Sequence, residues 1–78
     1  MPNKSIQDAR YRMVIVALRE QRDAVGLTQT ELANVLGRTQ QFVSKYEGLE
    51  RRLDVIEFVE IATALSLDWY SLLTRAMA

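Results

Sequence analysis

The polar residues that can cap a helix constrain the fold of this chain most. A serine, threonine or aspartate followed three residues later by an acidic residue is typical of a helix start, because the two side chains satisfy backbone N–H groups that the first turn leaves unpaired. Such pairs, or a single capping residue, stand at Ser5, Thr28, Thr39, Asp54 and Asp68. Apolar residues at helical spacing follow them, so we expect five helices.

The ends of these segments are set by glycines and by the next capping residue. Gly26, Gly37 and Gly48 tolerate the backbone conformations that end a helix. The predicted helices span residues 5–24, 29–36, 40–47, 55–65 and 69–77. No segment shows the alternation of a strand, an internal repeat or low complexity. The expected fold is therefore all α, and the 78 residues are expected to form a single domain.

The composition argues against several classes of function. The chain has no cysteine and no histidine, so the usual general base, the usual nucleophile pairs and most transition-metal sites are missing. Glu57 and Glu60 stand three residues apart, but no nucleophile lies near them in sequence, and a solvated helix face is the simpler interpretation. We expect a protein that is not an enzyme and that binds no metal or cofactor.

The apolar segments of the chain are short. The longest uninterrupted run, Met13–Leu18, has six residues, whereas a helix that crosses a bilayer needs about 20. No signal-peptide pattern precedes that run. The lack of cysteine suits a reducing compartment. These features predict a cytoplasmic protein with no membrane contact.

The charge of the chain is balanced overall but unevenly distributed. Ten basic and ten acidic residues give a formal net charge of zero, which is unexpected for a protein that binds nucleic acid. Residues 1–37 carry a net charge of +1, residues 38–52 carry +2 and residues 53–78 carry −3. This distribution fits a protein that presents its basic middle segment to phosphates and keeps its acidic end away from them.

The segment from residue 29 to residue 47 has the pattern of a helix-turn-helix. A tight turn at Gly37 joins its two short helices, and Ala33 falls where the helices touch and only a small side chain fits. The apolar residues expected in the core are Leu32, Leu36, Val43 and Tyr46. The polar residues left on the outer face of the second helix are Gln40, Gln41, Ser44 and Lys45. In this motif that face enters the major groove of DNA, so these four side chains are the predicted base contacts.

The stretch LTQTELANVLGRTQQFVSKYEG, and with it about residues 14–73, resembles the lambdoid phage repressor and Cro family of bacterial regulators. The resemblance implies a five-helix lambda-repressor-like DNA-binding domain, with the helix-turn-helix at its second and third helices and an extended first helix. It also implies a dimer that binds a palindromic operator in double-stranded DNA and regulates transcription as a repressor.

The resemblance also assigns roles to individual residues. Thr39, Gln40 and Gln41 match the start of the recognition helix, where the two glutamines would contact base edges. Thr39 and Gln29 would hold phosphates. The chemistry supports this reading independently, because a glutamine has one donor and one acceptor and can pair with N6 and N7 of adenine. Two adjacent glutamines can therefore read two adjacent base pairs.

Arg22 and Glu47 match an ion pair that the family uses to tie the first helix to the end of the recognition helix. The pair is expected to be partly buried and structural. The chain departs from the family pattern in the length of its first helix and at three positions, namely Arg38, Phe42 and Lys45. The DNA contacts are therefore expected to differ in detail from those of other members.

Basic residues flank the second helix of the motif on both sides. Arg38 precedes it, and Arg51 and Arg52 follow it, so the three are expected to clamp DNA phosphates. Lys45 can reach either a base or a phosphate. Phe42 can touch a thymine methyl group or pack in the core, and the core is the preferred interpretation.

Part of the first helix needs a second partner. Residues 13–18 are all apolar, so this part of the helix is apolar around its whole circumference. A helix that packs on one side only needs apolar residues at three to four positions in every two turns. Ile15 lies about 100° from Val14 around the helix, so the two cannot fully share one core. The residues expected on this second surface are Ile15, Trp69, Tyr70, Leu73 and Met77. The C-terminal helix or a second copy can cover it, and we expect a homodimer because one short recognition helix reads few base pairs.

A second class of function fits the same fold. In an antitoxin-type module, the acidic and apolar C-terminal half would bind a protein partner such as a toxin, and DNA binding would be secondary. An enzyme is supported only by scattered carboxylates. The resemblance favours the dimeric repressor.

Overall fold

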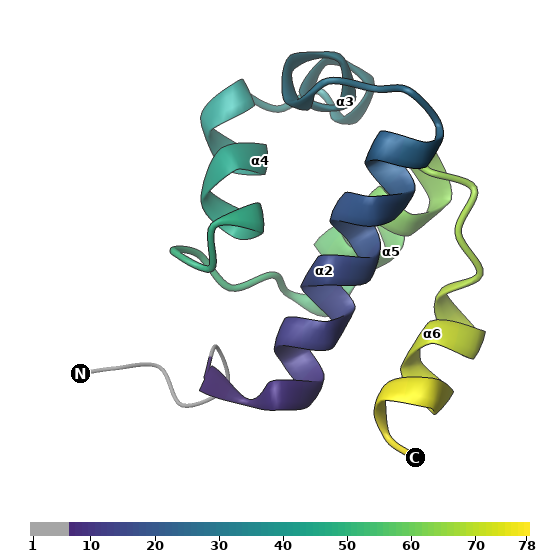
Figure 1. The fold of residues 1–78 in the computed structure, drawn as a ribbon. Coiled ribbons are helices and arrows are strands. Elements are labelled where there is room, and N and C mark those ends of the chain that lie inside the picture. Colours follow the sequence, from purple (N-terminus) through teal and green to yellow (C-terminus); the bar gives the residue numbers. More distant parts are fainter. Residues whose placement is uncertain (1–6) are drawn as a thin grey trace.

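The computed structural model describes residues 7–78, and within them it contains five helices and no strand. The helices are α2 (Ala9–Ala24), α3 (Gln29–Leu36), α4 (Gln40–Glu47), α5 (Val55–Ala64) and α6 (Trp69–Ala76), as Figure 1 shows. The predicted all-α, five-helix architecture is confirmed. No helix of this part of the chain has the length and apolarity needed to cross a bilayer.

Four of the predicted capping residues begin helices. Thr28, Thr39, Asp54 and Asp68 have extended backbones, and each side chain accepts a hydrogen bond from the backbone N–H three residues later. The first and third of these caps are complete capping boxes, because the acidic residue three positions on also accepts from the N–H of the cap. The polar residues therefore fix where these helices start.

The start of the first long helix differs from the prediction. The sequence predicts an uninterrupted helix over residues 5–24, but α2 begins at Ala9 and Asp8 is its cap. The Asp8 carboxylate accepts from the backbone N–H of Arg10 at 2.7 Å and from the Arg10 guanidinium at 2.8 Å. These hydrogen bonds also lower the pKa of Asp8. Ser5, the predicted cap, lies outside the described residues.

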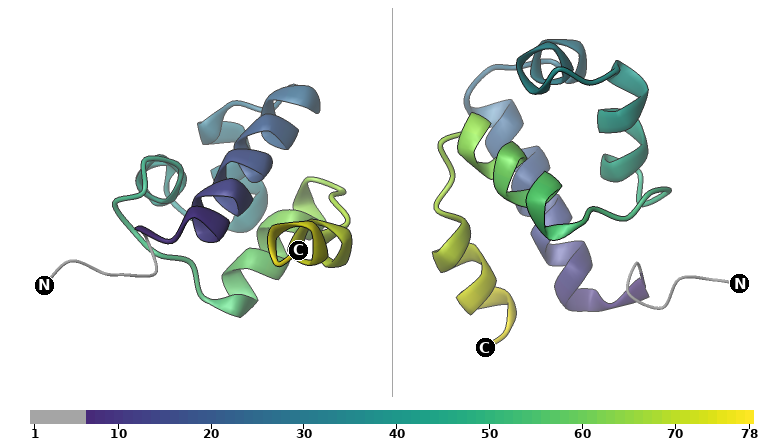
Figure 2. Two further views of the ribbon diagram at one scale, coloured as in Figure 1. Left: turned by 60° about the horizontal axis from the view of Figure 1, so that its bottom comes forward. Right: turned by 180° about the vertical axis from the view of Figure 1, so that it is seen from behind.

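The helices pack around one hydrophobic core. Helix α2 runs through the middle of the molecule, as Figures 1 and 2 show. The pair of α3 and α4 lies on one side of it, and α5 and α6 lie on the other. The pairs in contact include α3 with α4, α2 with α6, α3 with α5 and α2 with α4. The largest fully buried side chains are Tyr46, Leu18, Leu32, Ile61, Leu65, Leu72 and Val43. Each of the five helices supplies at least one of these side chains, and α6 supplies Leu72.

Ile15, one of the residues expected on a second surface of the first helix, is buried within the chain. Its side chain is only 2% exposed and belongs to the core. The reason is that α6 packs along α2 and covers the face that α3 and α4 leave open. Leu73 of α6 is half-buried against the same core. For Ile15, the partner is therefore the C-terminal helix of its own chain.

Candidate nucleic-acid interface

Helices α3 and α4 form a braced pair joined by a short turn. Gly37 closes α3 with a φ of 68°, in the left-handed region that favours glycine. Its N–H donates to the carbonyl of Asn34 at 3.2 Å, and the N–H of Arg38 donates to the carbonyl of Ala33 at 2.9 Å. Ala33 is buried at 1% exposure. This turn sets the angle at which α4 leaves α3 (Figure 1).

One face of α4 is buried and the other is polar and exposed. Val43 and Tyr46 are fully buried. Of the four residues expected to contact bases, Gln40, Gln41 and Lys45 are exposed and Ser44 is half-buried. The structure therefore places three of them in solvent on one short helix, with the fourth at the edge of that face.

Gln40 is held by a neighbour in α3. Its Nε2 donates to Oε1 of Gln29 at 2.8 Å, and Nε2 of Gln29 donates to Oε1 of Glu47 at 3.0 Å. Two hydrogen bonds thus link Gln40 at the start of α4, through Gln29 in α3, to Glu47 at the end of α4. Sequence reasoning placed Gln29 at a phosphate and missed its contact with Gln40, since the two residues are eleven positions apart.

The end of α4 is tied to α2 by an ion pair between Arg22 and Glu47. Nε of Arg22 lies 2.7 Å from Oε2 of Glu47, and Nη2 lies 3.0 Å from Oε1. The two side chains are 10% and 4% exposed. Nη1 of Arg22 also donates to the carbonyl of Leu27 at 2.8 Å, and the hydrogen bonds to Glu47 raise the pKa of Arg22. The structure therefore joins the two residues that the resemblance pairs.

Two of the three arginines expected to flank α4 contact one acid, Glu57, that was predicted to lie in solvent. Glu57 is 6% exposed, which corrects its assignment to a solvated face, whereas Glu60 is exposed. Oε2 of Glu57 lies 2.8 Å from Nη2 of Arg51 and 3.4 Å from Nη1 of Arg38. Arg52 is exposed and contacts neither oxygen. The capping pair of Asp54 and Glu57 was the one signal in the sequence that placed this carboxylate at a helix start.

Phe42 and Thr39 complete this side of α4. Phe42 is 9% exposed, so it packs in the core, and the guanidinium carbons of Arg38 and Arg51 lie 4.7 Å and 4.9 Å from the centre of its ring. Thr39 is exposed, and its hydroxyl accepts from the N–H of Phe42 at 3.3 Å. That hydroxyl keeps its own hydrogen for another acceptor.

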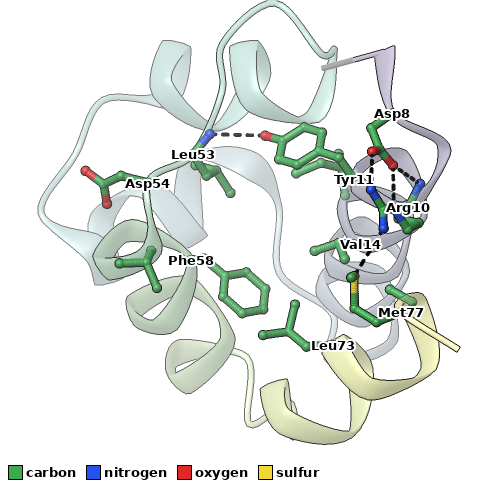
Figure 3. A pocket seen from close by; sticks show the side chains of 12 residues that line it. Asp8, Arg10, Tyr11, Val14, Leu53, Asp54, Phe58, Leu73 and Met77 are labelled. Carbon is green, nitrogen blue, oxygen red and sulfur yellow. Dashed lines mark hydrogen bonds and ion pairs between the residues drawn. The ribbon is translucent and has the colours of Figure 1, made fainter. Parts of the chain in front are cut away.

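A separate apolar pocket of about 360 Å³ lies away from α4, and Figure 3 shows it. Its walls come from the start of α2, the segment that leads into α5, and the end of α6. Ile15, Leu73 and Met77 are among the residues that line it. Trp69 and Tyr70 do not line it, so the structure separates them from the other residues of the expected second surface.

The residues described by the structure contain no cluster of acidic side chains that could hold a metal ion. The exposed amides and the flanking cations of the α3 and α4 pair are the groups on this face that can bind a ligand. Amide groups pair with base edges and guanidinium groups pair with phosphates. The chemistry of the face is thus that of a nucleic-acid interface.

Known proteins resemble the chain in both sequence and structure. Residues 18–71 match the helix-turn-helix family model. The solved structure of an XRE-family like protein from Pseudomonas syringae pv. tomato str. DC3000 matches with a TM-score of 0.85 and 50% sequence identity, over 95% of this chain and 90% of that chain. No curated protein matches the sequence. The predicted family is therefore confirmed, and the chain belongs to the XRE family of Cro/C1-type helix-turn-helix proteins, a family of DNA-binding regulators.

Proposed function

We propose that the protein binds a specific sequence of double-stranded DNA by placing α4 in the major groove. The observation that carries this proposal is the row of exposed polar side chains on α4. The other face of the same helix is buried in the core, so the polar row is the face that α4 can present to DNA. Gln40 and Gln41 contact base edges, and Ser44 and Lys45 extend the contact along the groove. The hydrogen bond from Gln40 to Gln29 orients the first amide before DNA arrives.

In this proposal the residues around α4 hold the DNA backbone. Gln29 and Thr39 lie at the starts of α3 and α4, where helix dipoles also favour phosphates. Arg38 precedes α4, and Arg51 and Arg52 follow it. Their charge explains how a chain with no net charge can bind a polyanion, since the local excess of positive charge is what a phosphate meets.

Selection of bound duplexes from a random-sequence DNA library tests the proposal. The wild-type chain is expected to select one sequence, and Gln40→Ala and Gln41→Ala are each expected to weaken binding to it by about ten- to hundredfold. Asn34→Ala serves as the matched control, because it removes an exposed amide from α3. Unchanged affinity in both glutamine variants would exclude base reading by these residues.

We further propose that the protein acts as a homodimeric repressor on a palindromic site in the cytoplasm. Helix α4 has eight residues and is about 12 Å long, so one copy reads only a few base pairs. Two copies related by a twofold axis would double the site and give it the symmetry of an inverted repeat. The selected sequence is expected to contain two half-sites whose centres are about one helical turn apart.

A protein partner such as a toxin is the second candidate for the part of the molecule that faces away from α4. The apolar pocket between α2, α5 and α6 is the observation that favours it, because apolar surface of this kind is common at protein interfaces. The mass of the purified protein in solution separates the candidates: a mass of two chains supports the homodimer, and one chain that co-purifies with a different small protein supports the partner. Neither outcome involves catalysis by this chain.

A further inference from the structure

Glu57 is a buried carboxylate with an unusual set of partners. Its side chain is 7% exposed. Oε1 accepts from the backbone N–H of Asp54 at 3.0 Å and from Nη1 of Arg51 at 2.9 Å, and Oε2 accepts from Nη2 of Arg51 at 2.8 Å. Oε2 also lies 3.4 Å from Nη1 of Arg38. One acid at the start of α5 therefore holds two cations, one from the segment before α4 and one from the segment after it.

The two arginines are held on one side and open on the other. Their side chains are 41% and 40% exposed for Arg38 and Arg51, respectively. Both guanidinium groups rest near the ring of Phe42 in the first turn of α4. Arg51 directs one Nη1 hydrogen to the carbonyl of Arg52 at 3.1 Å. Its Nε and one Nη2 hydrogen have no acceptor among the described residues, so they remain for an external anion.

Charge alone does not explain this arrangement in a protein that binds phosphates. A carboxylate beside two phosphate-binding cations reduces their attraction for DNA. A free arginine side chain, however, loses much of its rotamer freedom when it binds a phosphate. A buried acid that fixes two arginines beforehand removes most of that loss, and its own charge stays on the inner side of the pair.

We propose that Glu57 is a positioning residue that holds Arg38 and Arg51 as a preformed phosphate clamp beside the recognition helix. This inference rests on the proposed function, because it requires that the α4 face meets DNA. It extends that function by assigning a role to a residue in α5 that itself contacts no DNA. If Glu57 positions the arginines, removal of its charge should weaken DNA binding. If Glu57 acts only through its negative charge, the same change should strengthen DNA binding.

Glu57→Gln is the decisive variant. Glutamine has nearly the same shape and also serves in a capping box, but its amide cannot accept both hydrogen bonds of the Arg51 guanidinium. The probe is a mixed-sequence duplex of about 20 base pairs, or two helical turns, because phosphate contacts do not depend on sequence. Binding is measured by fluorescence anisotropy over a series of salt concentrations.

The expected result is binding about fivefold weaker at low salt, although the variant is one unit more positive than the wild type. The slope of log affinity against log salt concentration is expected to fall by about 1, because one phosphate contact is lost. If Glu57 acted only through its charge, the variant would bind more tightly and the slope would not fall. Either of those results would overturn the positioning role.

Glu60→Gln is the matched control, since it removes the same charge one turn later in α5, and Glu60 is exposed and forms no ion pair with any described residue. It is expected to bind as the wild type does or slightly more tightly. Circular dichroism at the assay temperature checks that both variants are folded.

A second variant keeps the test valid if Glu57→Gln unfolds. Arg51→Lys keeps the positive charge but cannot form the paired hydrogen bonds with Glu57, so it is expected to bind DNA more weakly than Arg52→Lys. Arg52 is the adjacent exposed cation without contact to Glu57. Equal affinities for the two lysine variants would contradict the proposal.

The failure of this inference can be told from the failure of the proposed function. If the wild-type chain selects no DNA sequence, the proposed function fails. If the wild type binds and Arg51→Ala lowers both the affinity and the salt slope while Glu57→Gln changes neither, the arginine contacts phosphate and only the positioning role of Glu57 fails.

Discussion

Glu57 shows at the scale of one residue how a tertiary contact changes the chemistry of a side chain. The hydrogen bonds from Arg51 hold the pKa of Glu57 at about 2, below its ordinary value of 4.5, and outweigh the opposite effect of burial. A carboxyl group whose pKa is lower in the folded chain than in the unfolded chain stabilises the fold only while it is charged. The contribution of Glu57 is therefore complete above about pH 4.5 and is lost as the pH falls toward about 2.

The predicted consequence is a difference in unfolding free energy that depends on pH. Glu57→Gln is expected to lower that free energy by about 2 kcal/mol at pH 7, and the difference from the wild type is expected to shrink between about pH 5 and pH 2. Urea unfolding followed by circular dichroism at several pH values measures it. Glu60→Gln should differ little from the wild type at any pH. A difference for Glu57→Gln that stays constant over this range would show that its charge is not what stabilises the fold.

Single residues were predicted well where the reason was local. Thr39 and Asp54 could be recognised as caps because their partners are three residues away in sequence. Glu57 was assigned to solvent because the arginines that approach it, Arg51 and Arg38, lie outside α5, six and nineteen positions earlier in the chain. Helical periodicity identifies which positions share a face, but it carries no information on which distant side chain will cover a charge.

At the scale of the helices, four of the described residues in the connections have a left-handed backbone, and two of them, a glycine and a serine, can be compared directly. Gly37 has a φ of 68° in the turn before α4, and Ser66 has a φ of 55° in the connection between α5 and α6. This region costs a residue with a Cβ atom about 1 kcal/mol or more, whereas glycine adopts it freely. Ser66 is exposed, so its side chain adds no buried contact to offset that cost.

Two substitutions are therefore expected to change stability in opposite directions. Gly37→Ala should lower the free energy of unfolding by about 1 kcal/mol, although no atom lies within 4 Å of the added methyl group. Ser66→Gly should raise it by about 0.5 kcal/mol, because the gain in the folded state exceeds the added entropy of the unfolded chain. Thermal and urea unfolding of both variants measures the two shifts. If both substitutions shifted the free energy of unfolding in the same direction, the left-handed backbone at these two positions would not be what determines their effect on stability.

The starts of α3 to α6 followed from capping residues, and the ends of α3 and α4 followed from glycines. The predicted ends of α5 and α6 lie one residue too far along the chain, and the predicted start of α2 is wrong. Ser5 and Asp8 have the spacing of a capping box, which predicts a start at Ser5. In the structure Asp8 is itself the cap, since its carboxylate binds the backbone and the guanidinium of Arg10. The sequence thus holds two overlapping capping signals, and their spacing alone does not predict which of them begins the long helix.

At the scale of the whole molecule, the resemblance predicted the order of the helices but left open what covers α2. Ile15 is covered by α6 of the same chain, so the apolar run from residue 13 to residue 18 does not by itself require a second copy. Apolar side chains beyond the contact between α2 and α6 remain exposed to solvent. Met13, Val55, Ile56 and Met77 are between 42% and 70% exposed. Two of them, Val55 and Met77, line the apolar pocket.

This surface gives the proposed homodimer a test that does not need DNA. Met77 is 64% exposed at the pocket, and its sulfur lies 3.9 Å from Nη1 of Arg10. Because a charged group is costly to bury in an apolar interface, Met77→Glu is expected to raise the dissociation constant of the dimer by about tenfold or more. Val35→Glu is the matched control, since Val35 is 63% exposed but lies in α3 outside the pocket. Sedimentation velocity over a range of protein concentrations should show more monomer for Met77→Glu than for the wild type or Val35→Glu. If both variants sediment as the wild type does, the carboxylate at the pocket remains in water in the dimer, and the two copies must therefore meet through another face.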